Sequence, residues 1–484
     1  MGILSKLNHI YSTLQALKAE LTESKSTFDD LRSRISTPTP PVSNPTHSHW
    51  QNEPFQIPPQ PLPTSTDIII IGSGISGASI AYTLLQKSSC NILILEARDI
   101  CSGATGRNGG HIKCSAYMEY SSLKDRFGES ARNLLRFQKR HMSLLLGLIG
   151  ELGIEAEARE VETVDIFTDE RAWEDAKRMV HVFKTDMPEE AGDIVVFDGV
   201  DGCQEYHVNP AHCYGIIKYK AAALSPYKFI TSLYGILQRN DNFAISPSTI
   251  VTEIVSADGD GYTVSTSRGQ IKAAQIVHAT DGFAATLIPG LEGKIFPVRG
   301  HVTVQSGCGF DASRSWCIHH KRGFDYISQR PGGELVVGGG VIQSPGRGVD
   351  EFGIWRDDGI CYSIRAYLGG LVETIFETQT KVEQAWSGCM GFTSDLLPFV
   401  GRLEESLTGR KGGGEWISAG FQGEGMVLAW LSGVAVGLMI AGDEEYQDEP
   451  GFPGGRVQEW LPRELICSKE RVDRLSISDL GVLL

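Results

Sequence analysis

The sequence lacks the cysteine patterns that bind metals or form a disulfide framework. Its ten cysteines are spread over 484 residues, without a C-x-x-C pair and without a Cys/His group at zinc-site spacing. Reduced and mostly buried thiols are typical of proteins in a reducing compartment. We therefore expect no metal site.

The sequence also lacks an excess of positive charge. Lys and Arg number 44 against 59 Asp and Glu, which gives a formal net charge of −15. No basic stripe is interleaved with aromatic residues, whereas phosphate neutralisation requires clustered Lys and Arg. Nucleic acid is therefore not an expected partner.

No segment has the pattern of a secretory signal or a clear membrane span. Residues 1–35 mix acids and bases without an uninterrupted apolar core. The uncharged run 425–442 is short for crossing ~30 Å of hydrocarbon, and it contains Gly433 and Gly437. A buried core helix is also apolar on all sides. The sequence therefore predicts a cytoplasmic protein without a transmembrane segment.

The regions outside the globular body differ from it in composition. Residues 1–35 have apolar side chains at helical spacing, which predicts an N-terminal helix that is either solvated or bound to a partner. Residues 36–66 form a Pro-rich linker, and Trp50 indicates that this linker docks on the body. The body begins at Asp67, and residues 446–484 form a C-terminal tail.

The start of the body has the pattern of a dinucleotide-binding turn. Residues 67–71 are a β-branched run, as in a strand that is buried on both faces. Gly72, Gly74 and Gly77 then follow in G-x-G-x-x-G spacing, and a helical pattern begins. Such glycines let the backbone approach a pyrophosphate, which lies at the positive end of the helix.

A carboxylate stands where a ribose would be bound. The predicted strand 91–95 is followed by Glu96, 19 residues after Gly77. A carboxylate at this spacing hydrogen-bonds the ribose diol and would repel a 2′-phosphate. FAD or NAD is therefore expected rather than NADP. Residues 101–111 follow as a small-residue run whose backbone can press against a ligand.

From about Asp67 to Gly442, the sequence resembles the D-amino-acid oxidase superfamily of FAD-dependent amine and amino-acid oxidoreductases. Its members include glycine and sarcosine oxidases, D-amino-acid dehydrogenases and γ-glutamylputrescine oxidase. The motifs that carry the resemblance are the fingerprint with Glu96-Ala97-Arg98, the run Gly-Ala-Thr-Gly-Arg-Asn-Gly-Gly at 103–110, Ala-Thr at 279–280, the Trp-x-Gly and Thr-x-Asp block at 386–398, and the Gly-rich turn at 420–426.

The resemblance implies an α/β fold, with a Rossmann-type, glutathione-reductase-like FAD domain and a second, mixed-sheet substrate domain. It implies a non-covalent FAD, because Gly388 rather than Cys389 aligns with the cysteine that attaches FAD in some relatives. The fingerprint and the resemblance together predict these FAD contacts: Gly72, Gly74, Ile75, Ser76, Gly77, Glu96, Ala97, Arg98, Gly103, Ala104, Thr105, Gly106, Arg107, Asn108, Gly109, Gly110, His111, Val251, Ala279, Thr280, Gly388, Asp395, Gly423, Gly425 and Met426.

Both predicted domains would be built from separated segments. The FAD domain would take residues 67–112, 224–293 and 384–445. The substrate domain would take residues 113–223 and 294–383. No oligomeric state is predicted.

The resemblance also implies the chemistry. The C–N bond of a small amine or amino acid would be oxidised by hydride transfer to flavin N5, giving an imine, and O₂ or an electron carrier would reoxidise the flavin. His111 and Tyr326 are candidate catalytic residues near the flavin and the substrate, and Arg330 could bind a carboxylate. Each has a purely structural alternative. Met390 replaces an Arg of some amino-acid oxidases, which disfavours a simple α-amino acid.

Two other functions remain open from the sequence. An NAD-dependent dehydrogenase would explain the fingerprint, but it leaves residues 103–110, 386–398 and 420–426 without a purpose. A flavin-containing binding or scaffold protein would instead give a purpose to residues 1–63.

Overall fold

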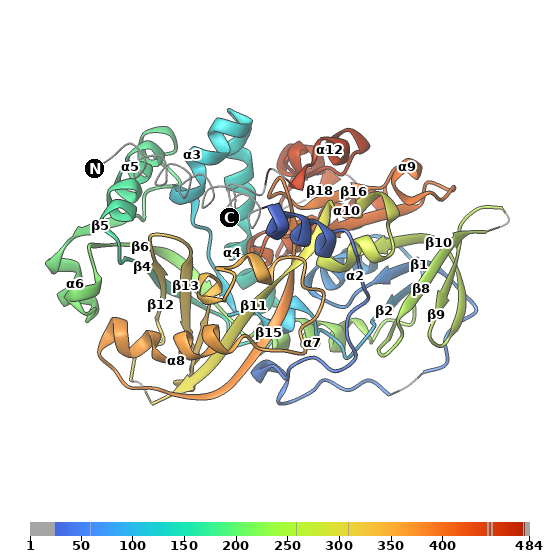
Figure 1. Cartoon of the computed structure of the whole chain (residues 1–484). Coiled ribbons are helices and arrows are strands. Elements are labelled where there is room, and N and C mark those ends of the chain that lie inside the picture. The colour runs from blue at the N-terminus through green and yellow to red at the C-terminus, as the bar shows by residue number, and fades with distance from the viewer. Residues whose placement is uncertain are drawn as a thin grey trace, which may run out of the picture.

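The computed structural model describes residues 25–58, 60–257, 259–307, 309–442, 445–446, 449–477 and 479. Two large β-sheets lie side by side, the first at the right of Figure 1 and the second at the left. The long strands β11 (Ile295–Ser306) and β15 (Lys381–Thr393) cross the middle of the molecule and belong to the second sheet.

The first sheet has the order β16-β17-β10-β1-β2-β7, and β8 and β9 extend it beside β10. β1 pairs in parallel with β10 and β2. Its isoleucines at 68–71 are all buried, as expected for a strand of a parallel sheet that is covered on both faces. The strands are β1 (Ser65–Ile71), β2 (Ile92–Leu95), β7 (Phe243–Ser246), β8 (Val251–Ser256), β9 (Tyr262–Thr266), β10 (Gly269–His278), β16 (Phe399–Arg402) and β17 (Glu415–Ala419).

The second sheet has the order β15-β11-β14-β13-β12-β4-β6-β3, with β5 beside β6. Side chains alternate along its strands, so Val164, Trp316 and Ile327 pack under helix α8 (Tyr362–Phe376), whereas Asp165 and Cys317 point to the opposite face. The remaining strands are β3 (His111–Ile112), β4 (Arg159–Phe167), β5 (Val195–Asp198), β6 (Gly215–Ala223), β12 (Arg314–His319), β13 (Phe324–Gln329) and β14 (Leu335–Gly338).

Helices cover both sheets, and a short hairpin, β18 (Glu445–Tyr446) and β19 (Gly455–Arg456), lies near the C-terminus. The other helices are α2 (Ile75–Lys87), α3 (Ala116–Phe127), α4 (Ser130–Glu151), α5 (Glu170–Asp186), α6 (Val200–Tyr206), α7 (Pro226–Leu237), α9 (Glu405–Thr408), α10 (Ala429–Ala441), α11 (Val457–Trp460) and α12 (Lys469–Arg474).

The uncharged run near residue 430 is a core helix. α10 packs on α2 so closely that a Cβ at Gly433 would lie 1.8 Å from Ser79 Oγ. Trp430 and Leu431 are fully buried in this interface. Among the described residues, no helix combines the length and apolar character needed to cross a membrane.

Both ends of the described chain dock on the body. Of the predicted N-terminal helix, residues 1–24 lie outside the described residues, whereas residues 25–35 are helical and bury Leu31 and Ile35. In the C-terminal tail, Leu465 and Val472 are buried.

The strand pairing departs from the predicted domain boundaries at two places. β3 pairs with β6 and β15 pairs with β11, so both belong to the second sheet, although the sequence placed residues 111–112 and 384–393 in the FAD domain. β15 cannot be divided between two sheets, because it pairs antiparallel with β11 along nearly its whole length.

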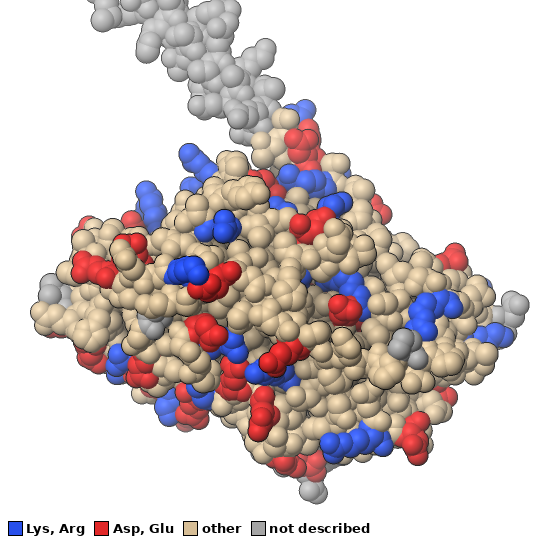
Figure 2. Space-filling view, turned by 90° about the horizontal axis from the view of Figure 1, so that it is seen from below, with Lys and Arg blue, Asp and Glu red and all other residues tan. Residues whose placement is uncertain are grey.

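On the face shown in Figure 2, basic and acidic side chains are interspersed.

Candidate functional site

The turn between β1 and α2 has no space for side chains at residues 72 and 77. Gly72 has a positive φ of 108°, and a Cβ there would lie 2.4 Å from the carbonyl oxygen of Ala279. Gly77 packs on the turn itself, since its Cβ would lie 2.1 Å from Gly72 O. Gly74 gives α2 no side-chain cap, and the N–H of Ile75 instead donates to Thr105 Oγ1 at 3.0 Å. The N-terminal turn of α2 lines the cavity through Gly74, Ile75 and Ser76.

Glu96 is held at the end of β2. Its Oε2 accepts hydrogen bonds from Ser73 N at 3.0 Å and Ser73 Oγ at 2.6 Å, and its Oε1 accepts one from Arg98 N at 3.0 Å. These bonds fix the carboxylate beside the glycine turn while it still lines the cavity. A carboxylate has about four acceptor positions, and three are used here, so Glu96 can still accept a hydrogen bond from a ribose hydroxyl.

Arg98 and Arg107 meet at one carboxylate. Asp357 lies 2.9 Å from Arg98 Nη1 and 3.3 Å from Arg107 Nε, and all three side chains are buried. Burial lowers the pKa of Arg107 to about 10, although Asp357 acts in the opposite direction. Both arginines reach the cavity wall, but their charged groups are used to fix the loop rather than left free for a ligand.

A single cavity of about 1640 Å³ joins this turn to the inner face of the second sheet. Thr280 Oγ1 is buried without a hydrogen-bond partner and lines the cavity, as expected of a group whose partner is a ligand. The predicted residues that line the cavity are Gly72, Gly74, Ile75, Ser76, Glu96, Ala97, Arg98, Gly103, Ala104, Thr105, Arg107, Asn108, Gly109, His111, Val251, Ala279, Thr280, Tyr326, Gly388, Gly423, Gly425 and Met426.

Five predicted site residues do not line the cavity: Gly77, Gly106, Gly110, Asp395 and Arg330. The three glycines are needed for close backbone packing, because a Cβ on any of them would lie about 2 Å from a carbonyl oxygen. Asp395 pairs at 2.8 Å with Arg471 of the C-terminal helix α12. Arg330 pairs at 2.7 Å with Glu157, so its guanidinium is directed away from the cavity.

His111 and Tyr326 do reach the cavity wall. Ser315 Oγ shares a hydrogen bond of 2.8 Å with His111 Nε2, and burial lowers the pKa of His111 to about 3, so the imidazole is neutral at neutral pH. The Tyr326 ring lies against Gly109, where a Cβ would come within 2.2 Å of the ring. Burial raises the pKa of Tyr326, which keeps the phenol protonated.

A buried charge cluster on the inner face of the second sheet was not predicted. Lys113 Nζ lies 2.9 Å from Asp165 Oδ1, and the hydroxyls of Tyr117 and Tyr219 donate to Asp165 Oδ2 at 2.6 and 3.0 Å. Asp165, Cys317 and His319 offer ligand atoms within 4.8 Å of one another, but Lys113 already neutralises the carboxylate. The cluster therefore supplies polar groups to the cavity rather than a free metal site.

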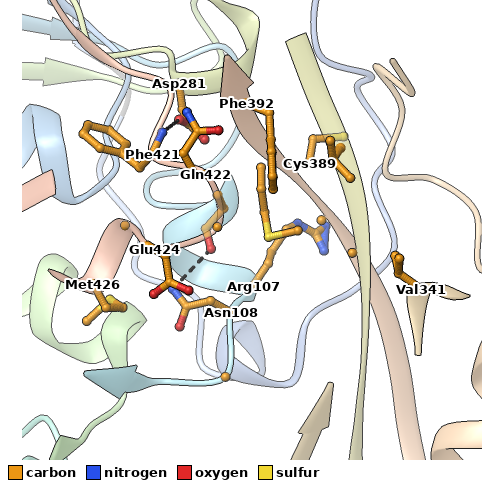
Figure 3. A pocket seen from close by; sticks show the side chains of 18 of the residues that line it. Arg107, Asn108, Asp281, Val341, Cys389, Phe392, Phe421, Gln422, Glu424 and Met426 are labelled. Carbon is orange, nitrogen blue, oxygen red and sulfur yellow. Dashed lines mark hydrogen bonds between the residues drawn. The ribbon is translucent and has the colours of Figure 1, made fainter. Parts of the chain in front are cut away.

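A second unpredicted feature is a pair of carboxyl groups, Glu119 on α3 and Glu424 in the turn before η8 (Gly425–Val427). Both line the cavity, and Gln138 Nε2 donates to Glu119 Oε2 at 3.0 Å. Burial, together with Glu119, raises the pKa of Glu424 to about 8. Figure 3 shows Glu424 and Met426 from this turn beside Asn108 and Arg107. This raised pKa favours the protonated form of Glu424 at neutral pH.

Comparison with known proteins identifies FAD-dependent oxidoreductases as relatives of this chain. The profile of the FAD dependent oxidoreductase (DAO) family matches residues 67–437. γ-Glutamylputrescine oxidoreductase of Escherichia coli is 20% identical over 408 residues, 81% of this chain and 88% of that protein. Glycine oxidase of Bacillus licheniformis is 25% identical over 406 residues, 78% of this chain and 93% of that protein.

Solved structures show the same fold. The crystal structure of glycine oxidase from Geobacillus kaustophilus superposes with a TM-score of 0.60 at 21% identity, covering 80% of this chain and 97% of that one. The family profile spans most of the sequence, and the cavity has the glycine turn, the ribose acid and the unpaired Thr280 hydroxyl that FAD needs. The chain belongs to the DAO family of FAD-dependent oxidoreductases, and FAD is its cofactor.

Proposed function

We propose that this enzyme oxidises the C–N bond of a small amine or amino acid to an imine. The observation that carries the proposal is the continuity of the cavity, which joins the glycine turn at Gly72 to polar groups of the second sheet such as Tyr326 and His319. When bound, FAD supplies the electron acceptor, which takes a hydride equivalent at N5 from the carbon that bears nitrogen. The imine product then hydrolyses in water.

The cofactor would be held by groups at one end of the cavity. Glu96 would hydrogen-bond the ribose, the N-terminus of α2 would bind the pyrophosphate, and Thr280 Oγ1 would donate to the cofactor. The attachment would be non-covalent, because Cys389 is buried and its Sγ is directed to Ile354 O at 3.4 Å. Burial raises the pKa of this thiol, which disfavours its reactive thiolate.

The substrate would occupy the other end of the cavity. Tyr326 and the neutral imidazole of His111 would form walls that orient the amine and exclude water. The Glu119–Glu424 pair would accept the ammonium proton: a substrate R–NH₃⁺ and one ionised carboxylate of the pair give R–NH₂ and a carboxylic acid. The two named relatives support an amine substrate, since their names specify glycine and γ-glutamylputrescine.

The test is an absorbance spectrum of the purified protein before and after acid precipitation, followed by anaerobic mixing with a panel of compounds. The panel contains glycine, sarcosine, γ-glutamylputrescine, larger amines and a 2-hydroxy acid. A yellow protein whose colour is released by acid and bleached by an amine supports the proposal. A colourless protein that binds NAD contradicts it, and so does bleaching by the hydroxy acid alone. A yellow protein that no compound bleaches would favour a binding or scaffold role.

A further inference from the structure

A segment outside the family match lies against the predicted FAD loop. Residues 37–58, here named the strap, precede the matched range 67–437 and run along the body in extended form. Only one short helical turn interrupts them, η1 (His49–Gln51). The strap is visible in Figure 1 as the blue chain along the lower edge of the molecule.

Trp50 anchors the strap to the loop. Its indole N–H donates to the carbonyl oxygen of Asn108 at 2.7 Å, and only 7% of Trp50 is exposed. The guanidinium of Arg330 lies over the indole ring, 5.3 Å from its centroid, and is itself held by Glu157. The indole is therefore held between Arg330 and the loop, and Trp50 is not among the residues that line the cavity.

Thr46 forms the second anchor. Its N–H donates to Asp357 O at 2.8 Å, its Oγ1 accepts from Ser387 N at 3.0 Å, and its carbonyl oxygen accepts from Arg107 Nη2. Arg107 in turn donates to Ser387 O at 3.0 Å. These hydrogen bonds join Thr46, Ser387 and Arg107 in a ring. Arg107 is the one large charged side chain of the loop.

The loop is held by hydrogen bonds, such as those of Arg107 and Asn108, more than by packing of large side chains. Six of the eight residues at 103–110 are Gly, Ala or Thr, and side chains of this size make few packing contacts. Gln51 of the strap also approaches the backbone of Gly106, where a Cβ would lie 3.1 Å from Gln51 Nε2. Ordering a backbone costs about 1–2 kcal/mol per residue, so a loop that is ordered in advance binds a ligand more tightly.

We infer that Trp50 and Thr46 are positioning residues for FAD: the strap holds residues 103–110 in the conformation that binds the cofactor. This inference rests on the proposed contact between FAD and that loop. It gives a function within the enzyme to part of the segment that precedes the family match at residue 67.

The test compares FAD binding in four full-length variants and the unmodified protein. Trp50→Phe removes the indole donor and keeps an aromatic ring, and Thr46→Val removes the hydroxyl at nearly constant volume. Thr46→Ser keeps the hydroxyl and should rescue binding. Trp416→Phe is the matched control, because its indole donates to Gln275 Oε1 at 2.8 Å and neither residue lines the cavity.

Apoprotein is titrated with FAD, and the thermal midpoint of each apoprotein is measured separately. Trp50→Phe loses the indole hydrogen bond, and Thr46→Val loses the two that the hydroxyl makes with Asp357 O and Ser387 N. Each variant should weaken FAD binding by about five- to thirtyfold. Thr46→Ser and Trp416→Phe should bind FAD as the unmodified protein does.

Two outcomes overturn the inference. In the first, FAD affinity is unchanged in both strap variants while the apoprotein midpoint falls, which would mean that the strap only stabilises the fold. In the second, Trp416→Phe weakens FAD as much as Trp50→Phe. If Trp50→Phe does not fold, the FAD affinities of Thr46→Val and Thr46→Ser are compared, and this comparison tests the inference by itself. An unmodified protein that binds no FAD would instead contradict the proposed function.

Discussion

Lys113 Nζ lies 2.9 Å from Asp165 Oδ1 on the inner face of the second sheet, where the lysine side chain is 10% exposed and the aspartate 0%. Burial would lower the pKa of Lys113, but the carboxylate outweighs it and raises that pKa. Burial alone would raise the pKa of Asp165, but Lys113 holds it well below its usual range. The pair is therefore ionised throughout the physiological range and brings fixed charge into the cavity wall.

Lys113→Met should destabilise the protein at neutral pH, by no more than about 3–5 kcal/mol, since it removes the nearest counter-charge of a buried carboxylate and leaves it only His319, whose Nε2 lies 3.5 Å from Asp165 Oδ2. The measurement is urea unfolding of the apoprotein. Asp165 has a depressed pKa, so its stabilising effect is present above the ordinary value of 3.8 and is lost as the pH falls. The deficit of the variant should therefore shrink in acid. Lys381→Met, at an exposed ion pair, is the control and should change little.

Glu424→Gln should change how stability depends on pH. Burial first, and Glu119 second, raise the pKa of Glu424 from 4.5 to about 8, so the folded protein holds a proton that the unfolded chain has lost. The group therefore makes stability fall as the pH rises from about 4.5 to 8. Thermal midpoints should fall less steeply over this range in the variant. Glu119→Gln removes one cause of the raised pKa of Glu424, so the pH range over which stability falls should end at a lower pH. An unaltered pH profile of stability in both variants would contradict the raised pKa of Glu424.

Glu96→Ala should weaken FAD binding by roughly 10- to 100-fold, because hydrogen bonds to a charged acceptor contribute about 1.5–3 kcal/mol. FAD titration of the apoprotein measures the effect. Glu253→Ala on β8 removes an exposed acid of the same kind and should leave the affinity unchanged. Equal affinity in both variants would show that Glu96 does not contact the ribose.

Cys389→Ser should leave the flavin content and its release by acid unchanged. The thiol is buried against Ile354 O, and burial raises its pKa, so it has little of the thiolate that covalent attachment requires. Protein is precipitated with acid, and the colour of pellet and supernatant is compared. Colour that stays in the pellet for the unmodified protein and moves to the supernatant for Cys389→Ser would show a covalent bond.

The features that the sequence predicted well are contiguous. The strand at 67–71, the glycines after it and Glu96 form one local unit, and local hydrogen bonds such as that from Arg98 N to Glu96 hold it together. The uncharged helix near Trp430 was likewise favoured as a core helix because of the Gly-rich segment 420–425 before it, and it packs on α2. Patterns of this kind need no knowledge of distant partners.

The features that were missed depend on partners far apart in the chain. Asp165 is 52 residues from Lys113 in sequence, and no motif marks either residue. Asp357, which fixes Arg98 and Arg107, was not predicted for the same reason. Arg330 was a candidate for binding a substrate carboxylate, but its side chain pairs with Glu157. A sequence pattern does not show in which direction a long side chain at the end of a strand points.

The most direct test of the central claim uses the amine that bleaches the flavin fastest, prepared with deuterium on the carbon that bears nitrogen. Enzyme and amine are mixed without oxygen, the loss of flavin colour is timed, and the product is identified. The proposed C–N oxidation predicts slower bleaching with the deuterated amine, together with the carbonyl compound and free amine that hydrolysis of an imine releases. Bleaching at the same rate for both isotopes, with no carbonyl product, would contradict it.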